Sequence, residues 1–155
     1  MKSHALAAAI LFGLLGSVSS DAPAQAQVSC TSGPYRLQLP KTYKGLRTMG
    51  QLRRERVLKT EESGVLRELR FNGLELEVIT SPAGYTVSKA IVTTRNWKIA
   101  GPLRVGVSAR TALKGLKATG VPSDGEIEFN GDADSIRVNL SRGRVLDFEY
   151  TCSAE

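Results

Sequence analysis

Residues 65–78 read Val-Leu-Arg-Glu-Leu-Arg-Phe-Asn-Gly-Leu-Glu-Leu-Glu-Val, and this stretch decides the fold. Before the Asn72-Gly73 pair, three apolar residues stand at odd-numbered positions: Val65, Leu69 and Phe71. After it, three stand at even-numbered positions: Leu74, Leu76 and Val78. A period of two is typical of a β-strand that buries one face. Asn and Gly both accept the positive φ of a two-residue hairpin turn. The stretch therefore predicts two antiparallel strands joined by a tight turn.

The same pattern continues on both sides of this hairpin. Residues 52–60 fit either a charged helix or a strand, and we favour a strand because Glu62-Ser63-Gly64 is typical of a turn. A second turn is indicated at 81–84, and residues 85–94 are rich in β-branched side chains, which favour strands. The first half of the chain is thus expected to form four consecutive antiparallel strands.

Three more strands are predicted near the C-terminus, around residues 127–129, 136–140 and 146–150. Each alternates apolar with polar residues, and short polar turns join them. In the last of them, Leu146, Phe148 and Tyr150 are expected to share the buried face.

One helix is predicted between the two groups of strands. Ser108 is a suitable N-cap, because its hydroxyl can accept a hydrogen bond from a free backbone N–H. A buried stripe would follow at i, i+3, i+4 and i+7, and Gly120 and Pro122 would end the helix. The stripe consists of Ala109, Ala112, Leu113 and Leu116. The expected fold class is α+β: a mainly antiparallel sheet of about seven strands with one amphipathic helix packed on it.

The N-terminus has the pattern of a cleavable signal peptide over residues 1–26. An apolar run at 5–15 is too short for a bilayer, which needs about 20 residues. It is followed by small residues ending in Ala24-Gln25-Ala26, which suits cleavage after Ala26. Residues 27–155 are then expected to form a single α+β domain in the periplasm or outside the cell. No later segment is apolar enough to be transmembrane.

Two alternatives to cleavage after Ala26 remain open. One is an uncleaved anchor, and the other is a lipoprotein attached through Cys30, which follows Val28 and Ser29. Gln27 stands where a lipid-attachment site usually has Leu, so we interpret Cys30 as an ordinary cysteine of the mature chain. Cys30 and Cys152 are the two cysteines of the chain, and in an oxidising compartment we expect them to form a disulfide bond. A bridge closing so long a loop stabilises by about 4–5 kcal/mol in the chain-entropy model.

Charge is distributed unevenly around a formal net charge of +6. Residues 27–72 hold ten Lys and Arg against four acidic residues, whereas residues 106–155 hold six against eight. The basic residues that we take as a candidate binding face are Arg53, Arg54, Arg56, Lys59, Arg67 and Arg70. They are either a binding face or solvated strand residues. An exported basic protein has anionic lipid, acidic glycan or an acidic protein as its natural partners, and we expect no nucleic acid.

Several kinds of chemistry are not indicated. The single histidine, His4, leaves with the signal peptide, so no catalytic Ser-His or Cys-His pair, no metal and no cofactor are expected in the mature chain. Glu126 and Glu128 share a strand face, where solvation is a simpler explanation than catalysis. Residues 130–134 begin like a calcium loop but lack the later glycine and glutamate of that pattern. We therefore expect a protein that is not an enzyme.

Residues 101–108, together with the small residues and helix breakers that follow them, form a recurrent periplasmic pattern. The pattern consists of a Gly, an aliphatic residue, a second Gly, a Ser cap and a short helix that ends near Gly-x-Pro. Over about residues 101–151 the chain resembles small outer-membrane assembly lipoproteins of the BamE/SmpA type and the repeats of the β-lactamase inhibitor protein. The resemblance implies a helix-plus-sheet domain that binds other proteins. We therefore expect a periplasmic protein that engages another envelope protein, as an inhibitor or immunity-type protein. The alternative is an envelope structural component that binds lipopolysaccharide or peptidoglycan through a basic face.

Overall fold

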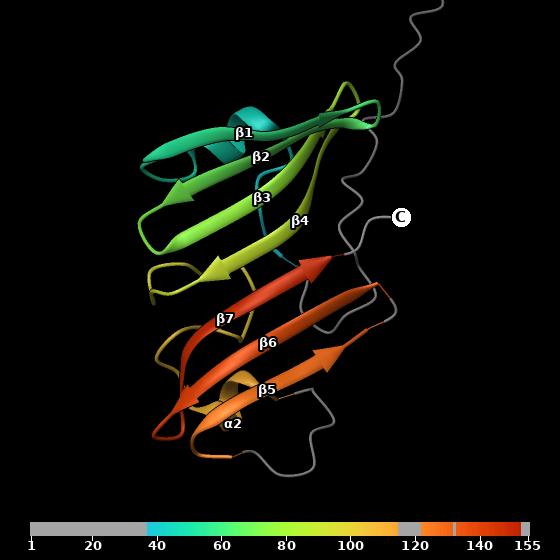
Figure 1. The fold of residues 1–155 in the computed structure, drawn as a ribbon. Helices are drawn as coiled ribbons and strands as arrows, with labels where there is room; N and C mark the ends of the chain where they lie inside the picture. The colour runs from blue at the N-terminus through green and yellow to red at the C-terminus, as the bar shows by residue number, and fades with distance from the viewer. Residues whose placement is uncertain (1–36, 115–121, 132, 153–155) are drawn as a thin grey trace, which may run out of the picture.

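A computed structural model describes residues 37–114, 122–131 and 133–152 of the protein. Seven strands form one antiparallel sheet, as the sequence predicted, and the structure places them in the order β1-β2-β3-β4-β7-β6-β5 (Figure 1). The strands are β1 (Arg54–Glu61), β2 (Gly64–Phe71), β3 (Leu74–Ser81), β4 (Gly84–Val92), β5 (Gly125–Asn130), β6 (Asp134–Ser141) and β7 (Arg144–Cys152). Two meanders, β1–β4 and β5–β7, therefore make one continuous surface.

The two meanders meet where β4 pairs with β7. Residues 89–92 of β4 run antiparallel to residues 148–151 of β7. The last strand of the chain thus lies at the middle of the sheet, and the first strand of each meander, β1 and β5, lies at an edge.

The hairpin between β2 and β3 turns at Asn72-Gly73 as predicted, although of these two residues only Gly73 has a positive φ. Phe71 and Leu74 are directly opposed at its end, and Gly73 has φ 75. This conformation is costly for any residue with a Cβ atom.

Bulges allow strands with an irregular apolar pattern to keep one buried face. In β4, Lys89 lies opposite Glu77 but Val87 lies opposite Val78, so Ser88 is an extra residue. In β7, Asp147 lies opposite Asn139 but Val145 lies opposite Leu140, so Leu146 is an extra residue. The expectation that Leu146 shares the buried face is therefore wrong. Leu146 is 57% exposed, and Val145 occupies the core instead.

Within the described part of the chain, the core lies against one face of the sheet. Buried side chains of β2, β3, β4, β6 and β7 pack there against Leu46, Ile99 and Leu103 and against the start of α2. Figure 1 shows both helices on this side, behind the sheet. Trp97 also belongs to this side, where its ring meets Phe71 edge-on at 5.5 Å and its Nε1 donates to Asn72 O at 2.8 Å. It is thus part of the packing on this side of the sheet.

The helical content differs from the prediction of one amphipathic helix. The segment α2 (Ala109–Ala112) is a single turn, capped by Ser108 as predicted, with Thr111 N–H donating to Ser108 Oγ at 3.2 Å. It ends at Ala112, because Leu113 leaves the helical region at φ −96 and ψ 9. The expected residues Leu116 to Gly120 lie outside the described ranges.

A second short helix, α1 (Tyr43–Thr48), was not predicted. Thr42 caps it by accepting a hydrogen bond from Gly45 N–H at 3.1 Å, and Leu46 is its buried residue. The mainly antiparallel sheet is thus confirmed. In place of the one amphipathic helix that was expected, the described residues contain two short helices, α1 and α2.

Other expectations lie wholly or partly outside the described ranges. Residues 1–26 and Cys30 are among the residues not described, so the signal peptide and the cysteine pair stay predictions. Cys152 is buried at the end of β7. No helix within the described part of the chain has the length and apolar character needed to cross a membrane.

Candidate binding surface

The second face of the sheet is the main candidate for a binding surface. Residues that oppose each other across an antiparallel pair point to the same side of a sheet, so the register traces two rows of side chains across all seven strands. One row contains Arg54, Arg70, Glu75, Ile91, Glu149, Arg137 and Glu128. The other contains Arg56, Glu68, Glu77, Lys89, Thr151, Ser135 and Asn130. We call this surface the open face, because both helices lie on the other side (Figure 1).

Charges on the open face are held in place by their neighbours. Lys89 Nζ lies 3.2 Å from Glu149 Oε1, and Arg137 Nε lies 3.3 Å from Glu126 Oε1. Asn139 Nδ2 donates to Asp147 Oδ1 at 2.6 Å. Exposed pairs of this kind add little stability, about 0–1 kcal/mol each. Their main effect is to orient charged groups on a flat surface.

The six basic residues of the candidate face are divided by the structure. Arg54, Arg56, Lys59 and Arg70 lie on the open face, because they oppose one another or other open-face residues. Arg67 lies on the opposite face with Leu69 and Phe71. Arg53 precedes β1, and its backbone N–H donates to Arg70 O at 2.8 Å.

Arg67 belongs to a cluster that joins the sheet to α1. Its Nη1 donates to Glu55 Oε1 at 3.2 Å, and its Nε donates to Thr80 Oγ1 at 3.2 Å. Glu55 also pairs with Arg47 Nε at 2.8 Å and accepts a hydrogen bond from the Tyr43 hydroxyl at 2.7 Å. Through these contacts, Arg67 and Glu55 hold α1 against β1 and β2.

Tyr43 has a raised pKa as a result of this cluster. Burial, followed by the hydrogen bond to Glu55 and the charge of that carboxylate, raises the pKa of Tyr43 to about 12. The folded state therefore favours the neutral hydroxyl, which supports a structural role for the cluster.

Glu68 is the buried acid of the open face. It lies in the middle of β2 and is only 6% exposed. Arg70 contacts Glu68 Oε1 through Nη2 at 2.7 Å and through Nε at 2.8 Å, and Arg56 Nε lies 3.4 Å from Oε2. Two arginines of the candidate face are thus paired with Glu68, whereas Arg53 and Arg54 have no ion pair among the described residues.

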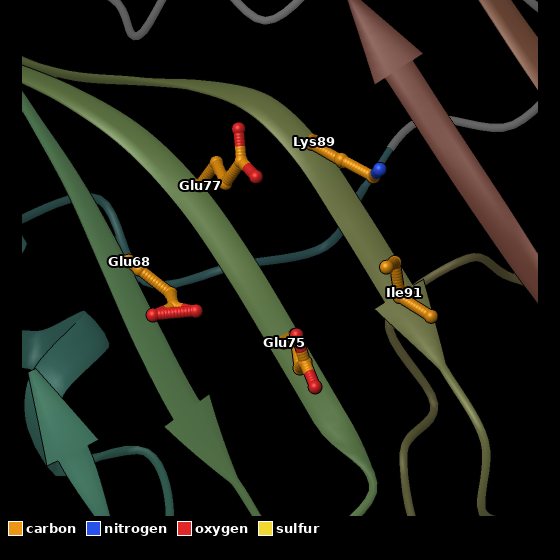
Figure 2. Close-up of a pocket in the computed structure, with 5 residues that line it drawn as sticks. All are labelled: Glu68, Glu75, Glu77, Lys89 and Ile91. Carbon is orange, nitrogen blue, oxygen red and sulfur yellow. The ribbon is translucent and has the colours of Figure 1, made fainter. Parts of the chain in front are cut away.

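A shallow hollow lies beside Glu68 on the open face. Figure 2 shows its lining on β2, β3 and β4, which consists of Glu68, Glu75, Glu77, Lys89 and Ile91. It has space for about one water molecule. Within the described residues, Glu68 Oε2 is buried without a hydrogen-bond donor, and Glu77 has no ion pair. The hollow therefore presents carboxylate oxygens close to the arginines of β1 and β2.

The opposite end of the open face is acidic. Glu126 and Glu128 on β5 both face Arg137, at 3.3 Å and 4.0 Å, so the two carboxylates are solvated and paired. Asp134 is buried, and Asp132 lies outside the described ranges. No group of acids, histidines and cysteines that fits a metal ion occurs among the described residues.

The alternation of side chains along a strand was enough to predict part of this geometry. Arg67 and Arg70 are three residues apart in one strand, so they must lie on opposite faces. No comparable pattern predicted the pairing of Glu68 with Arg56 or the cluster around Glu55, because these contacts join β2 to β1 and to α1.

Comparison with known proteins found no matching family model, curated protein or solved structure.

Proposed function

We propose that this chain is an exported, non-enzymatic protein that binds another envelope protein and inhibits it. The observation that carries the proposal is the open face, a sheet surface that runs from a basic edge at β1 to an acidic edge at β5. Patterned charge of this kind gives a protein complex its orientation, its specificity and a fast association rate. The signal-peptide pattern of residues 1–26 supports a location in the envelope.

The basic edge is the part of the surface that we assign to the partner. Arg53 and Arg54 are exposed and have no carboxylate partner among the described residues, so binding an acid there would break no existing pair. The partner is expected to present acidic residues to this edge.

Affinity capture from periplasmic extract with residues 27–155 as bait tests this function. We expect a partner whose recovery falls about tenfold with Arg53→Glu plus Arg54→Glu, since each exposed ion pair contributes up to about 1 kcal/mol. Arg110→Glu is the matched control, because Arg110 is exposed on α2, on the other side of the sheet. Equal recovery by both variants and the wild type would exclude the basic edge. A bound partner whose activity is unchanged would exclude inhibition.

Intact mass measurement tests export and the cysteine pair together. We expect the exported protein to begin at Gln27 and to weigh two hydrogens less than its reduced form, as a Cys30–Cys152 bridge requires. A lipid adduct on Cys30 would show a lipoprotein instead.

A second candidate function is an envelope structural component that binds lipopolysaccharide or peptidoglycan. The same unpaired arginines favour it, because anionic phosphates and carboxylates suit them. Glu68 and Glu75, which alternate with Arg56 and Arg70 next to this edge, favour a protein partner more strongly than a uniform polyanion. Pull-down on purified lipopolysaccharide and on peptidoglycan separates the two functions. Strong retention on either, lost with the Arg53 and Arg54 variant, would favour the structural component.

A further inference from the structure

The edge strand β1 offers a backbone as well as charged side chains. It pairs only with β2 among the described residues, over residues 54–61. In an antiparallel pair about half of the backbone N–H and C=O groups of an edge strand point away from its neighbour. These groups are the template on which an extended segment of another chain can add as a further strand.

The two sides of β1 differ in chemistry. On the open face it carries Arg54, Arg56 and Lys59, which oppose Arg70, Glu68 and Leu66 of β2. Glu61 follows on the same face and pairs with Lys59, so three basic residues stand there against one acidic residue. On the other side lie Glu55 and Val57. Glu55 is already bound by Arg47, Arg67 and Tyr43, so it adds little negative charge at the edge.

Exposed apolar side chains are concentrated on this strand. Val57 is 50% exposed and Leu58 is 37% exposed, and among the described residues the one other large exposed apolar side chain is Leu146. Leu58 is the extra residue of a bulge, since Val57 opposes Arg67 and Lys59 opposes Leu66. Regular pairing is therefore available mainly over residues 54–57, before the bulge.

A second copy of the chain is a poor occupant for this edge. Antiparallel self-pairing that places Val57 opposite Leu58 also places Arg56 opposite Lys59, and like charges directly opposed are destabilising. The charge of the edge instead complements an acidic strand.

We propose that β1 accepts an extended segment of the partner protein in which acidic and apolar residues alternate. The acidic side chains lie beside Arg54, Arg56 and Lys59, and the apolar ones lie beside Val57, because side chains of adjacent strands keep to the same two faces. This inference rests on the proposed function, and it names the kind of partner segment.

The test uses two synthetic eight-residue peptides with blocked ends, one alternating Glu with Val and the other alternating Lys with Val. Amide hydrogen exchange measured by NMR on residues 27–155 locates the binding. We expect the Glu-Val peptide to slow exchange at outward amides of residues 54–57 and to bind about tenfold more tightly than the Lys-Val peptide, as three exposed ion pairs allow. The β5 edge is the internal control, because β5 carries Glu126 and Glu128 and no basic residue, so the Glu-Val peptide should leave its exchange unchanged.

Two further variants separate backbone pairing from simple charge attraction. Methylating alternate backbone nitrogens of the Glu-Val peptide leaves its charge unchanged and should abolish the protection. Arg54→Glu with Lys59→Glu should reverse the preference in favour of the Lys-Val peptide. Neither substitution disturbs Glu68, whose partners are Arg56 and Arg70.

The inference is overturned if the Glu-Val peptide leaves exchange in β1 unchanged, or if the methylated peptide protects β1 equally well. If envelope capture still depends on Arg53 and Arg54 in that case, the proposed function stands and only the mode of binding is wrong. If no envelope partner is captured but the peptide protects β1, the proposed function is wrong. The ability of β1 to pair with an extended acidic segment would still stand.

Discussion

Gly73 provides the sharpest stability test, because a methyl group there meets both backbone strain and a steric clash. Its φ of 75 places it in the left-handed region, where an L-residue costs about 1–2 kcal/mol. A Cβ atom at Gly73 would lie 2.7 Å from Thr94 Cβ and closer still to Thr94 Cγ2 and Oγ1. Overpacking of this kind adds about 1–3 kcal/mol.

Gly143 is a matched control for the strain alone. Its φ is 68, and a Cβ atom there would have nothing within 4 Å. Both Gly→Ala changes stabilise through the unfolded chain by a similar amount, about 0.4–1 kcal/mol, so this contribution cancels in the comparison. We expect Gly73→Ala to lower the free energy of unfolding by about 3 kcal/mol and Gly143→Ala to lower it by about 1 kcal/mol.

Urea denaturation followed by circular dichroism measures both changes. Thr94→Ala removes the two closest atoms, so the double variant with Gly73→Ala should recover about 1 kcal/mol relative to the sum of the single changes. Equal losses for Gly73→Ala and Gly143→Ala would refute the packing of Thr94 against the hairpin. Additive losses in the double variant would refute it as well.

The remaining predictions concern the core, the phenol cluster and the cap. Val145→Ala should cost about 1–3 kcal/mol in thermal unfolding, whereas Leu146→Ala should change stability by less than about 0.5 kcal/mol, and the reverse order would contradict the bulge. Because the pKa of Tyr43 is raised to about 12, its contribution is complete below pH 10 and is lost between pH 10 and pH 12. Solvent screening reduces it to about 1 kcal/mol, so the wild type should lose about that much more stability than Tyr43→Phe across this range, and parallel pH curves would contradict the cluster. Ser108→Ala should cost about 1 kcal/mol through loss of the cap on α2, and no change in the melting temperature would exclude that role.

Local patterns in the sequence were sufficient to predict the hairpins. The period of two around Asn72-Gly73 and the turn at 81–84 predicted adjacent strands, because such pairs depend on neighbouring residues and on turn residues. The same reasoning failed at Leu146, since a bulge depends on the register of the partner strand. It also failed for the length of the helix, because Leu113 leaves the helical region although the apolar spacing suggests a longer stripe.

The candidate binding surface was predicted less completely. The sequence identified a basic cluster, and strand parity could have separated Arg67 from Arg70. It contained no sign that Glu68 would be buried between Arg56 and Arg70, or that Glu55 would be shared by Arg47, Arg67 and Tyr43. Apart from the contact between Glu68 and Arg70 within β2, these contacts join residues on different elements, so they exist only when the strands and α1 are assembled.

By itself, the sequence determined the sheet class, the number of strands and the uneven charge, because alternation, turn chemistry and composition are local properties. Only the tertiary structure decided that β4 pairs with β7, that both helices lie on one face, and that β1 remains an edge. The physical reason is that strands distant along the chain pair through burial of a shared core. Among the described residues, that choice leaves one face of the sheet uncovered and β1 at one of its two edges, and both proposals rest on it.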